Sequence, residues 1–177
     1  LLRWLGERGA AAPLDAALAL CPTGHLPSSA AALRKTSHIV YDLRFAVLYG
    51  RRVRRGLENA GRRPHGFLRH RSMRRLDEDF ASLWAGAASA DDYYDAASAH
   101  HVAGSIAKPT LIVASKDDPF VPFEPLVEHF GSSPSIDLRL SAHGAHVAFL
   151  TRHDGVLAPD YPRLLLDPLD IDAPPFA

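Results

Sequence analysis

The chain has 177 residues, and its 20 basic and 20 acidic side chains give a formal net charge of zero at pH 7. Apolar residues make up 47% of it, which argues against a disordered segment and supplies enough material for one domain with a hydrophobic core. The neutral balance argues against a dedicated nucleic-acid binder, and no apolar run approaches the roughly 20 residues that cross a bilayer.

The first segments of the chain predict a helix followed by a core strand. Residues 1–7 have the apolar spacing of a helix but no N-cap residue before them, so we expect a helix whose beginning lies upstream. Residues 14–21 form a short apolar run closed by Pro22, which is typical of a strand buried on both faces of a parallel sheet. The alanine content of this run leaves a helix open as the alternative.

A long middle region, residues 27–104, has mostly helical periodicity and no clear strand. We predict helices over three segments, which are residues 37–49, 76–84 and 91–98. Ten arginines lie between Arg51 and Arg75, against one acid, Glu58. Because the whole chain is neutral, we expect this run to be a solvated, salt-bridged face, with a phosphate- or nucleic-acid-binding surface as the weaker alternative.

Strand character returns in the last third of the chain. Thr110–Ser115 is short, apolar and β-branched, and it is the clearest strand of the sequence. Glu124–Phe130 then predicts a helix and residues 136–140 a second clear strand. Strands that alternate with helices predict an α/β fold with a mostly parallel sheet and an inserted helical cap.

This alternation divides the chain into four parts. They are an initial helix and core strand (residues 1–22), the helical cap (residues 23–105), the C-terminal strands and their loops (residues 106–158), and a proline-rich surface tail (residues 159–177).

Polar residues that suit acid–base chemistry follow the two clear strands. The segment Asp117-Asp118-Pro119 comes after the first strand, and His143-Gly144-Ala145-His146 comes after the second. In open α/β sheets, catalytic groups gather at the carboxyl ends of the strands. An acid orients a histidine, and the histidine moves a proton to and from a nucleophile, so the order acid-then-histidine predicts the end of a Ser…Asp…His triad.

At these residues the chain resembles the YheT-like α/β-hydrolases. The matching segments are residues 1–7, 12–17, 91–94, 108–113, 116–120 and 143–149. The combination of Asp-Asp-Pro-Phe with His-Gly-x-His-Val-x-Phe is the most specific part of the resemblance. The resemblance implies the C-terminal part of an α/β-hydrolase fold, with Asp118 as the triad acid and His146 as the triad base.

In that family the opening helix directly follows the nucleophile elbow Gly-x-Ser-x-Gly, which does not occur in these 177 residues. The resemblance therefore implies a fragment of a serine hydrolase whose nucleophile lies upstream, and which is inactive as it stands. The expected substrate of the complete protein is a small-molecule carboxylic ester with an acyl or lipid-like chain. The alternative is a non-catalytic fragment or binding module of the same fold.

Other residues are weaker candidates for the same chemistry. Asp117 is the second choice for the acid, and His143 is the competitor for the base. Cys21 ends an apolar strand, where a lone cysteine is usually part of the core. Three serines lack the glycine-flanked turn that exposes a nucleophile, namely Ser105, Ser115 and Ser141.

The sequence implies no cofactor, no metal, no nucleic-acid partner and no stable membrane insertion. Its ten histidines include no His-Glu-x-x-His pair, and we expect the His100-His101 doublet to point to opposite sides of its element. The single cysteine excludes an internal disulfide bond and a Cys-based zinc site. With no secretory signal in view, we expect a cytoplasmic protein.

Overall fold

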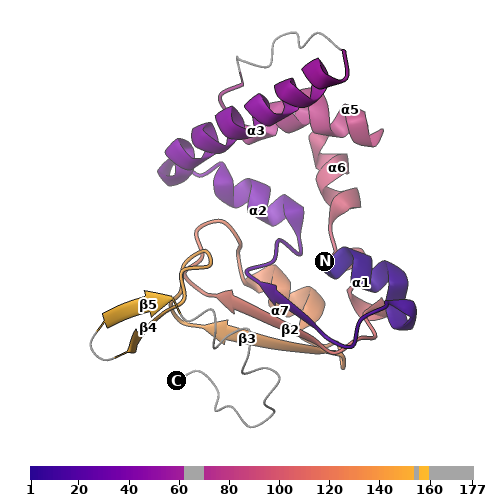
Figure 1. Ribbon diagram of the computed structural model, residues 1–177, viewed down its shortest axis with the longest axis vertical. Helices are drawn as coiled ribbons and strands as arrows, with labels where there is room; N and C mark the ends of the chain where they lie inside the picture. Colours follow the sequence, from indigo (N-terminus) through magenta and orange to yellow (C-terminus); the bar gives the residue numbers. More distant parts are fainter. Residues whose placement is uncertain (62–69, 154–155, 160–177) are drawn as a thin grey trace.

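A three-stranded parallel sheet forms one half of the molecule and a group of helices forms the other (Figure 1). The computed structural model describes residues 1–61, 70–153 and 156–159. The sheet has the order β1 (Ala17–Leu20), β2 (Thr110–Ser115), β3 (Ile136–Ser141). These observations confirm the α/β fold class that the sequence predicts.

Strand β2 is the centre of the sheet, and all six of its residues are buried. A strand covered on both faces has no polar side to show, which explains its continuous apolar sequence. Ile112 and Ala114 face a large core cluster, while Leu111 and Val113 face a smaller one. Their alternation follows from the two-residue repeat of a strand.

Three helical segments cover the larger cluster. They are α1 (Leu2–Arg8), the 3-10 helix η5 (His100–Ser105) and α7 (Glu124–Phe130). The cluster includes Leu5, Ile112 and Phe130, each with no exposed surface. Beside it, the short 3-10 helix η1 (Gly9–Ala11) turns the chain from α1 toward β1.

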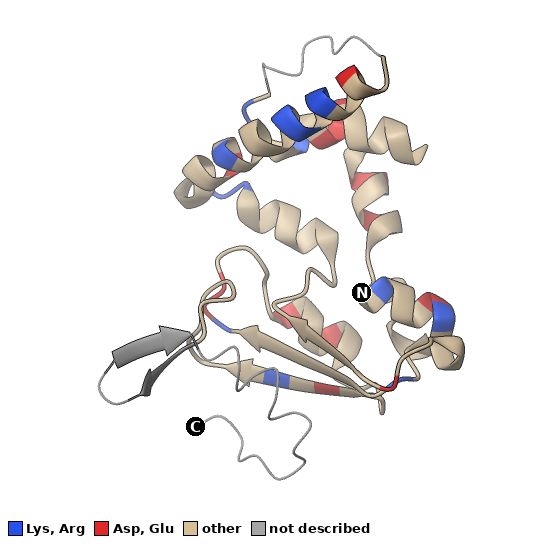
Figure 2. Ribbon diagram, viewed as in Figure 1, with Lys and Arg blue, Asp and Glu red and all other residues tan. Residues whose placement is uncertain are grey.

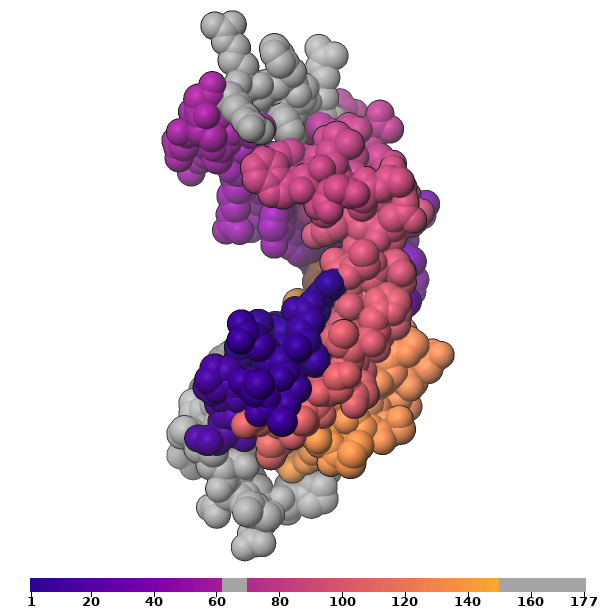
Figure 3. All heavy atoms as spheres, turned by 90° about the vertical axis from the view of Figure 1, so that its right-hand side faces the viewer, coloured from indigo at the N-terminus to yellow at the C-terminus, as the bar shows by residue number. Residues whose placement is uncertain are grey.

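The helical cap is inserted between β1 and η5 and lies above the sheet in Figure 1. Its elements are α2 (Leu26–Leu33), the 3-10 helix η2 (Thr36–His38), α3 (Ile39–Asn59), α4 (Met73–Leu76), the π-helical turn η4 (Asp77–Ala81), α5 (Ser82–Ala85) and α6 (Ala90–Ala97). In the space-filling view a hollow separates part of the cap from the sheet-bearing half (Figure 3).

Polar contacts hold the cap helices to one another. Asp42 of α3 is buried and accepts the backbone N–H of Met73 at 2.7 Å, which fixes the start of α4. The hydroxyl of Tyr94 donates to Asp77 at 2.7 Å and joins α6 to η4. Burial of the Asp77 carboxyl raises its pKa, and the hydrogen bond from Tyr94 opposes that rise.

The arginine-rich segment lies partly on α3 and partly on α4, with acids on the neighbouring elements (Figure 2). Arg54 pairs with Glu58 at 2.8 Å, and Arg75 pairs with Asp79 at 3.3 Å. Arg74 pairs with Asp91 of α6. Residues 62–69 of the segment lie outside the described part of the chain.

Several element boundaries differ from the sequence prediction. The strand predicted over residues 14–21 is only Ala17–Leu20, and the helix predicted over residues 37–49 continues as α3 to Asn59. The strand is shorter than its apolar run and the helix is longer than its predicted segment, because a side-chain pattern and a hydrogen-bonded element need not end at the same residue. Strands β4 (Leu150–His153) and β5 (Val156–Pro159) pair antiparallel as a hairpin that we did not predict.

The predicted tail over residues 159–177 falls outside the described residues from residue 160 onward. Among the described helices, none combines the length and the apolar character that a bilayer crossing requires.

The packing of α1 on η5 yields a stability prediction. A methyl group at Gly6 would lie 2.3 Å from the backbone oxygen of Val102, which cannot move aside as a flexible side chain would. We expect Gly6→Ala to lower the free energy of unfolding by about 1–3 kcal/mol, the usual range for overpacking. Urea denaturation of both proteins measures the change.

The matched control is Gly56→Ala in α3, where an added methyl group meets nothing within 4 Å. We expect that substitution to raise the free energy of unfolding by about 0.5–1 kcal/mol, because alanine loses less backbone entropy in a helix than glycine does. Equal effects of the two substitutions would contradict the close α1–η5 contact.

Candidate active site

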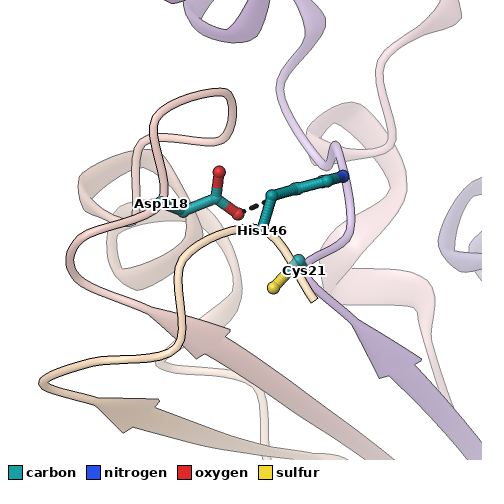
Figure 4. Close-up of side chains that lie close together, drawn as sticks. All are labelled: Cys21, Asp118 and His146. Carbon is teal, nitrogen blue, oxygen red and sulfur yellow. Dashed lines mark hydrogen bonds and ion pairs between the residues drawn. The ribbon is translucent and has the colours of Figure 1, made fainter. Parts of the chain in front are cut away.

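The candidate acid and base lie in two adjacent loops at the carboxyl end of the sheet. Strands β2 and β3 pair in parallel with Ser115 opposite Ser141, so the loops that follow them leave the sheet side by side. Asp118 is in the first loop and His146 in the second. The Nδ1 atom of His146 lies 2.9 Å from Oδ2 of Asp118, and the structure thus brings together two residues that are 28 positions apart (Figure 4).

The Asp118 side chain is 1% exposed, and its neighbours are groups that can donate hydrogen bonds to a carboxylate. Its Oδ1 atom accepts the backbone N–H groups of Phe120 at 2.8 Å and Val121 at 3.0 Å. A buried carboxylate is costly unless such donors replace water. With both of these donors on Oδ1, Oδ2 faces the histidine.

This contact determines which nitrogen of His146 carries the proton. An ionised carboxylate only accepts hydrogen bonds, so Nδ1 of His146 is the donor and Nε2 of the neutral ring is left with a lone pair. The His146 side chain is 39% exposed and lines a cavity. A ring in this state has the capacity to accept a proton at Nε2, and a carboxylate at Nδ1 stabilises the charged form of such a ring.

Asp117 holds the histidine loop instead of the histidine ring. Its Oδ1 atom accepts the backbone N–H of Ala145 at 2.8 Å, and the hydroxyl of Ser115 donates to the same oxygen. The hydrogen bond from Ser115, followed by that from Ala145, lowers the pKa of the Asp117 carboxyl. The competitor His143 lies near Asp117 with its side chain 91% exposed.

The loop around His146 has an unusual backbone. Ala145 and Val147 have φ angles of 43° and 63°, a left-handed conformation that costs non-glycine residues energy. The anchor from Asp117 to Ala145 offsets part of this cost. In Figure 4 the near edge of the His146 ring, which carries Nδ1, faces the Asp118 carboxylate, and the rest of the ring extends away from it.

Cys21 also lies beside the pair, which the sequence did not predict. It follows β1 with a φ of 42°, is 3% exposed, and contributes a sulfur within 4.8 Å of the Asp118 oxygen and the His146 nitrogen. Burial raises the pKa of its thiol to about 11. Cys21 is therefore a protonated core thiol at neutral pH, and a poor nucleophile or metal ligand in that state.

A cavity of about 310 Å³ lies between the cap and the sheet, with His146 in its wall. One part of its lining is apolar, formed by Leu26, Ala30, Leu33, Phe45, Phe120 and Val121. Another part carries charged side chains and a phenol, contributed by Arg34, Asp42, Arg74, Asp77 and Tyr94. The aromatic side chains of Phe45, Tyr49 and Tyr94 are among those that line the cavity.

The predicted orientation of the His100-His101 doublet is wrong. The two ring centroids lie 3.8 Å apart, on the same side of the chain. Neighbouring side chains diverge by half a turn in a strand but by only a third of a turn in a 3-10 helix, and this doublet starts the 3-10 helix η5. His100, His101 and Asp95 form a second group with metal-ligating atoms within 4.8 Å of one another.

Comparison with known proteins identifies three kinds of relative. The chain is 30% identical over 150 residues to the putative esterase YheT of Escherichia coli (strain K12), covering 82% of this chain and 44% of the relative. It is 33% identical over 84 residues to phospholipase ABHD3 of Bos taurus, covering 47% of this chain and 20% of the relative. It is 29% identical over 181 residues to medium-chain fatty acid ethyl ester synthase/esterase 2 of Saccharomyces cerevisiae (strain ATCC 204508 / S288c), covering 86% of this chain and 39% of the relative.

The chain thus spans less than half the length of each of these relatives. No family model and no solved structure matches it.

The environment of Cys21 predicts slow alkylation. With its pKa raised from 9.0 to about 11, its thiolate fraction near pH 8 is about a hundredfold lower than that of an unshifted thiol. We expect iodoacetamide to modify the folded chain at least about a hundredfold more slowly than the urea-unfolded chain, as mass spectrometry at pH 8 measures. Equal rates in the two states would show that Cys21 is neither buried nor shifted.

Proposed function

The chain belongs to the YheT-like α/β-hydrolases, and we propose that it supplies the acid and the base of a Ser-His-Asp centre that hydrolyses carboxylic esters. The single observation that carries the proposal is the 2.9 Å contact between Nδ1 of His146 and the buried carboxylate of Asp118. Two of the three kinds of relative are named as esterases and the third as a phospholipase, which supports ester hydrolysis.

In this mechanism His146 acts through its Nε2 atom. It takes the proton of a serine hydroxyl as the serine oxygen bonds to the acyl carbon, and then gives that proton to the departing alkoxide. A water molecule then gives a proton to His146, attacks the acyl carbon of the acyl-enzyme and releases the carboxylic acid, while the serine oxygen takes the proton back. In both steps Asp118 holds the ring and stabilises its charged form. The nucleophilic serine is proposed outside residues 1–177, because no Gly-x-Ser-x-Gly occurs within them.

The cavity at His146 supports an ester whose acyl part is apolar. Leu26, Leu33 and Phe45 bring cap side chains over it, and Phe120 packs edge-on against the His146 ring with centroids 5.4 Å apart. Such a lining binds hydrocarbon by the hydrophobic effect and excludes water from the reacting carbonyl.

A fluorophosphonate probe tests this proposal on the full natural chain, because the probe labels only an activated serine. We expect the wild-type protein to be labelled and to hydrolyse a short-chain nitrophenyl ester. His146→Ala and Asp118→Asn should each lower kcat/KM for that ester by about 10⁴-fold, the effect of removing a triad member or its tautomer control. Labelling by the probe should fall in parallel.

The matched control is His143→Ala, which removes an exposed histidine from the same loop and should leave hydrolysis within about twofold of wild type. Loss of activity in His143→Ala with retention in His146→Ala would reverse the assignment of the base. A natural protein whose intact mass equals that of these 177 residues, and which the probe does not label, would instead support a non-catalytic binding module of the same fold.

A further inference from the structure

Four histidines from three separate segments pack together at the base of the cap. His25 is the N-cap residue of α2, His100 and His101 begin η5, and His129 belongs to α7. The His100 ring is central, with centroid distances of 3.8 Å to His101 and 4.8 Å to both His25 and His129. We call these four residues the histidine cluster.

A carboxylate from a fourth segment faces the cluster. Oδ1 of Asp95, in α6, lies 3.1 Å from Nε2 of His101 and 3.9 Å from Nε2 of His100. The backbone oxygen of Asp95 also lies 3.1 Å from Nε2 of His101. Both imidazoles therefore turn the same nitrogen toward one carboxylate.

The hydrogen bonding of His100 is incomplete in the described part of the chain. Its side chain is 14% exposed, and its Nδ1 atom is buried with no hydrogen-bond partner there. A buried, unsatisfied ring nitrogen is uncommon and calls for an explanation. An imidazole that keeps its proton on Nδ1 has its Nε2 lone pair directed at the space beside Asp95.

Two rings of the cluster, His25 and His100, are partly enclosed by their neighbours. Burial lowers the pKa of His100, and the neighbouring imidazoles lower it further; burial and His129 act on His25 in the same direction. Neutral imidazole is the form that binds metal ions.

We propose that Asp95, His100 and His101 bind one divalent transition-metal ion of the Zn²⁺ class. Two imidazole nitrogens and one carboxylate oxygen form a borderline donor set that suits zinc, and three protein ligands leave a fourth position for water. In a tetrahedral zinc site with bonds of about 2.0–2.1 Å, neighbouring ligand atoms are about 3.3 Å apart. The observed 3.1 Å and 3.9 Å from the Asp95 oxygen lie near that spacing, and all three ligand atoms lie within 4.8 Å of one another.

The remaining two histidines support the site without binding the ion. The Nδ1 atom of His25 accepts the backbone N–H of Ser28 at 3.3 Å, which fixes its ring at the start of α2. His129 packs its ring against His100 from α7. Ring packing of this kind holds a ligand in one orientation, as outer contacts do in metal sites.

The site lies where the chain enters and leaves the cap. The backbone oxygen of Gly24, before α2, accepts the N–H groups of Ala99 at 3.0 Å and His100 at 3.2 Å. A bound ion joins the end of α6 to the start of η5 at this junction. The three ligands are not among the described residues that line the cavity at His146. The proposed ion therefore stabilises the base of the cap and takes no part in the proposed ester hydrolysis.

The test is a Zn²⁺ titration of the full natural chain, purified without a polyhistidine tag, stripped with a chelator and followed by competition with a chromogenic chelator. We expect one ion per chain and a rise in thermal midpoint when Zn²⁺ is added. His101→Ala and Asp95→Asn change exposed side chains, so both variants should fold. Each should weaken binding by more than about tenfold, the loss that even an outer contact causes.

Two control histidines separate this site from other places where zinc binds. His143→Ala removes a histidine that also lies near a carboxylate, and His146→Ala removes a member of the Cys21–Asp118–His146 group. Neither should change the affinity for Zn²⁺. Unchanged binding in His101→Ala would overturn the proposal, and so would binding that is lost in His146→Ala and kept in Asp95→Asn.

Discussion

The buried carboxylate of Asp118 is the constraint on which the rest of the site depends. An ionised group that is 1% exposed, left without partners, would cost several kcal/mol, and here two backbone N–H groups and one imidazole replace its water. The two backbone donors fix the loop after β2, and the imidazole draws in the loop after β3. The Asp118 carboxylate thereby joins the two loops, and the hydrogen bond from Ala145 to Asp117 joins them a second time.

The sheet makes this arrangement possible because β2 and β3 are parallel. The register that pairs Ser115 with Ser141 ends both strands at one level, so their loops begin as neighbours. Asp117 uses that closeness to bind the backbone of Ala145, which supports the left-handed residues on either side of His146. The two successive acids thus have different partners: Asp118 contacts the His146 ring, and Asp117 binds the backbone of the loop that carries His146.

The cap depends on its own polar contacts and on its attachment to the sheet. Asp42, Asp77 and Tyr94 join its helices, and the same residues reach the far part of the cavity at His146. At the attachment, Gly24 receives two hydrogen bonds from the start of η5, beside the histidine cluster. The proposed ion adds a link at that junction, because its ligands come from the last helix of the cap and from η5.

The sequence by itself determined the α/β class, the strands Thr110–Ser115 and 136–140, and the two polar loops that follow them. These are local properties, since burial on both faces leaves a continuous apolar run and the residues after a strand are read directly from the chain. The family resemblance favoured Asp118 over Asp117 as the triad acid and His146 over His143 as the triad base. Only the tertiary structure decided how Asp117 and Asp118 divide their partners, that Cys21 adjoins them, and that His100 and His101 share a side with Asp95. The contacts of Asp117, Asp118 and Cys21 join distant residues, and the contact of Asp95 with the two histidines depends on the 3-10 helix start. Strand register, left-handed turns and a 3-10 helix start leave no periodic signal in the sequence.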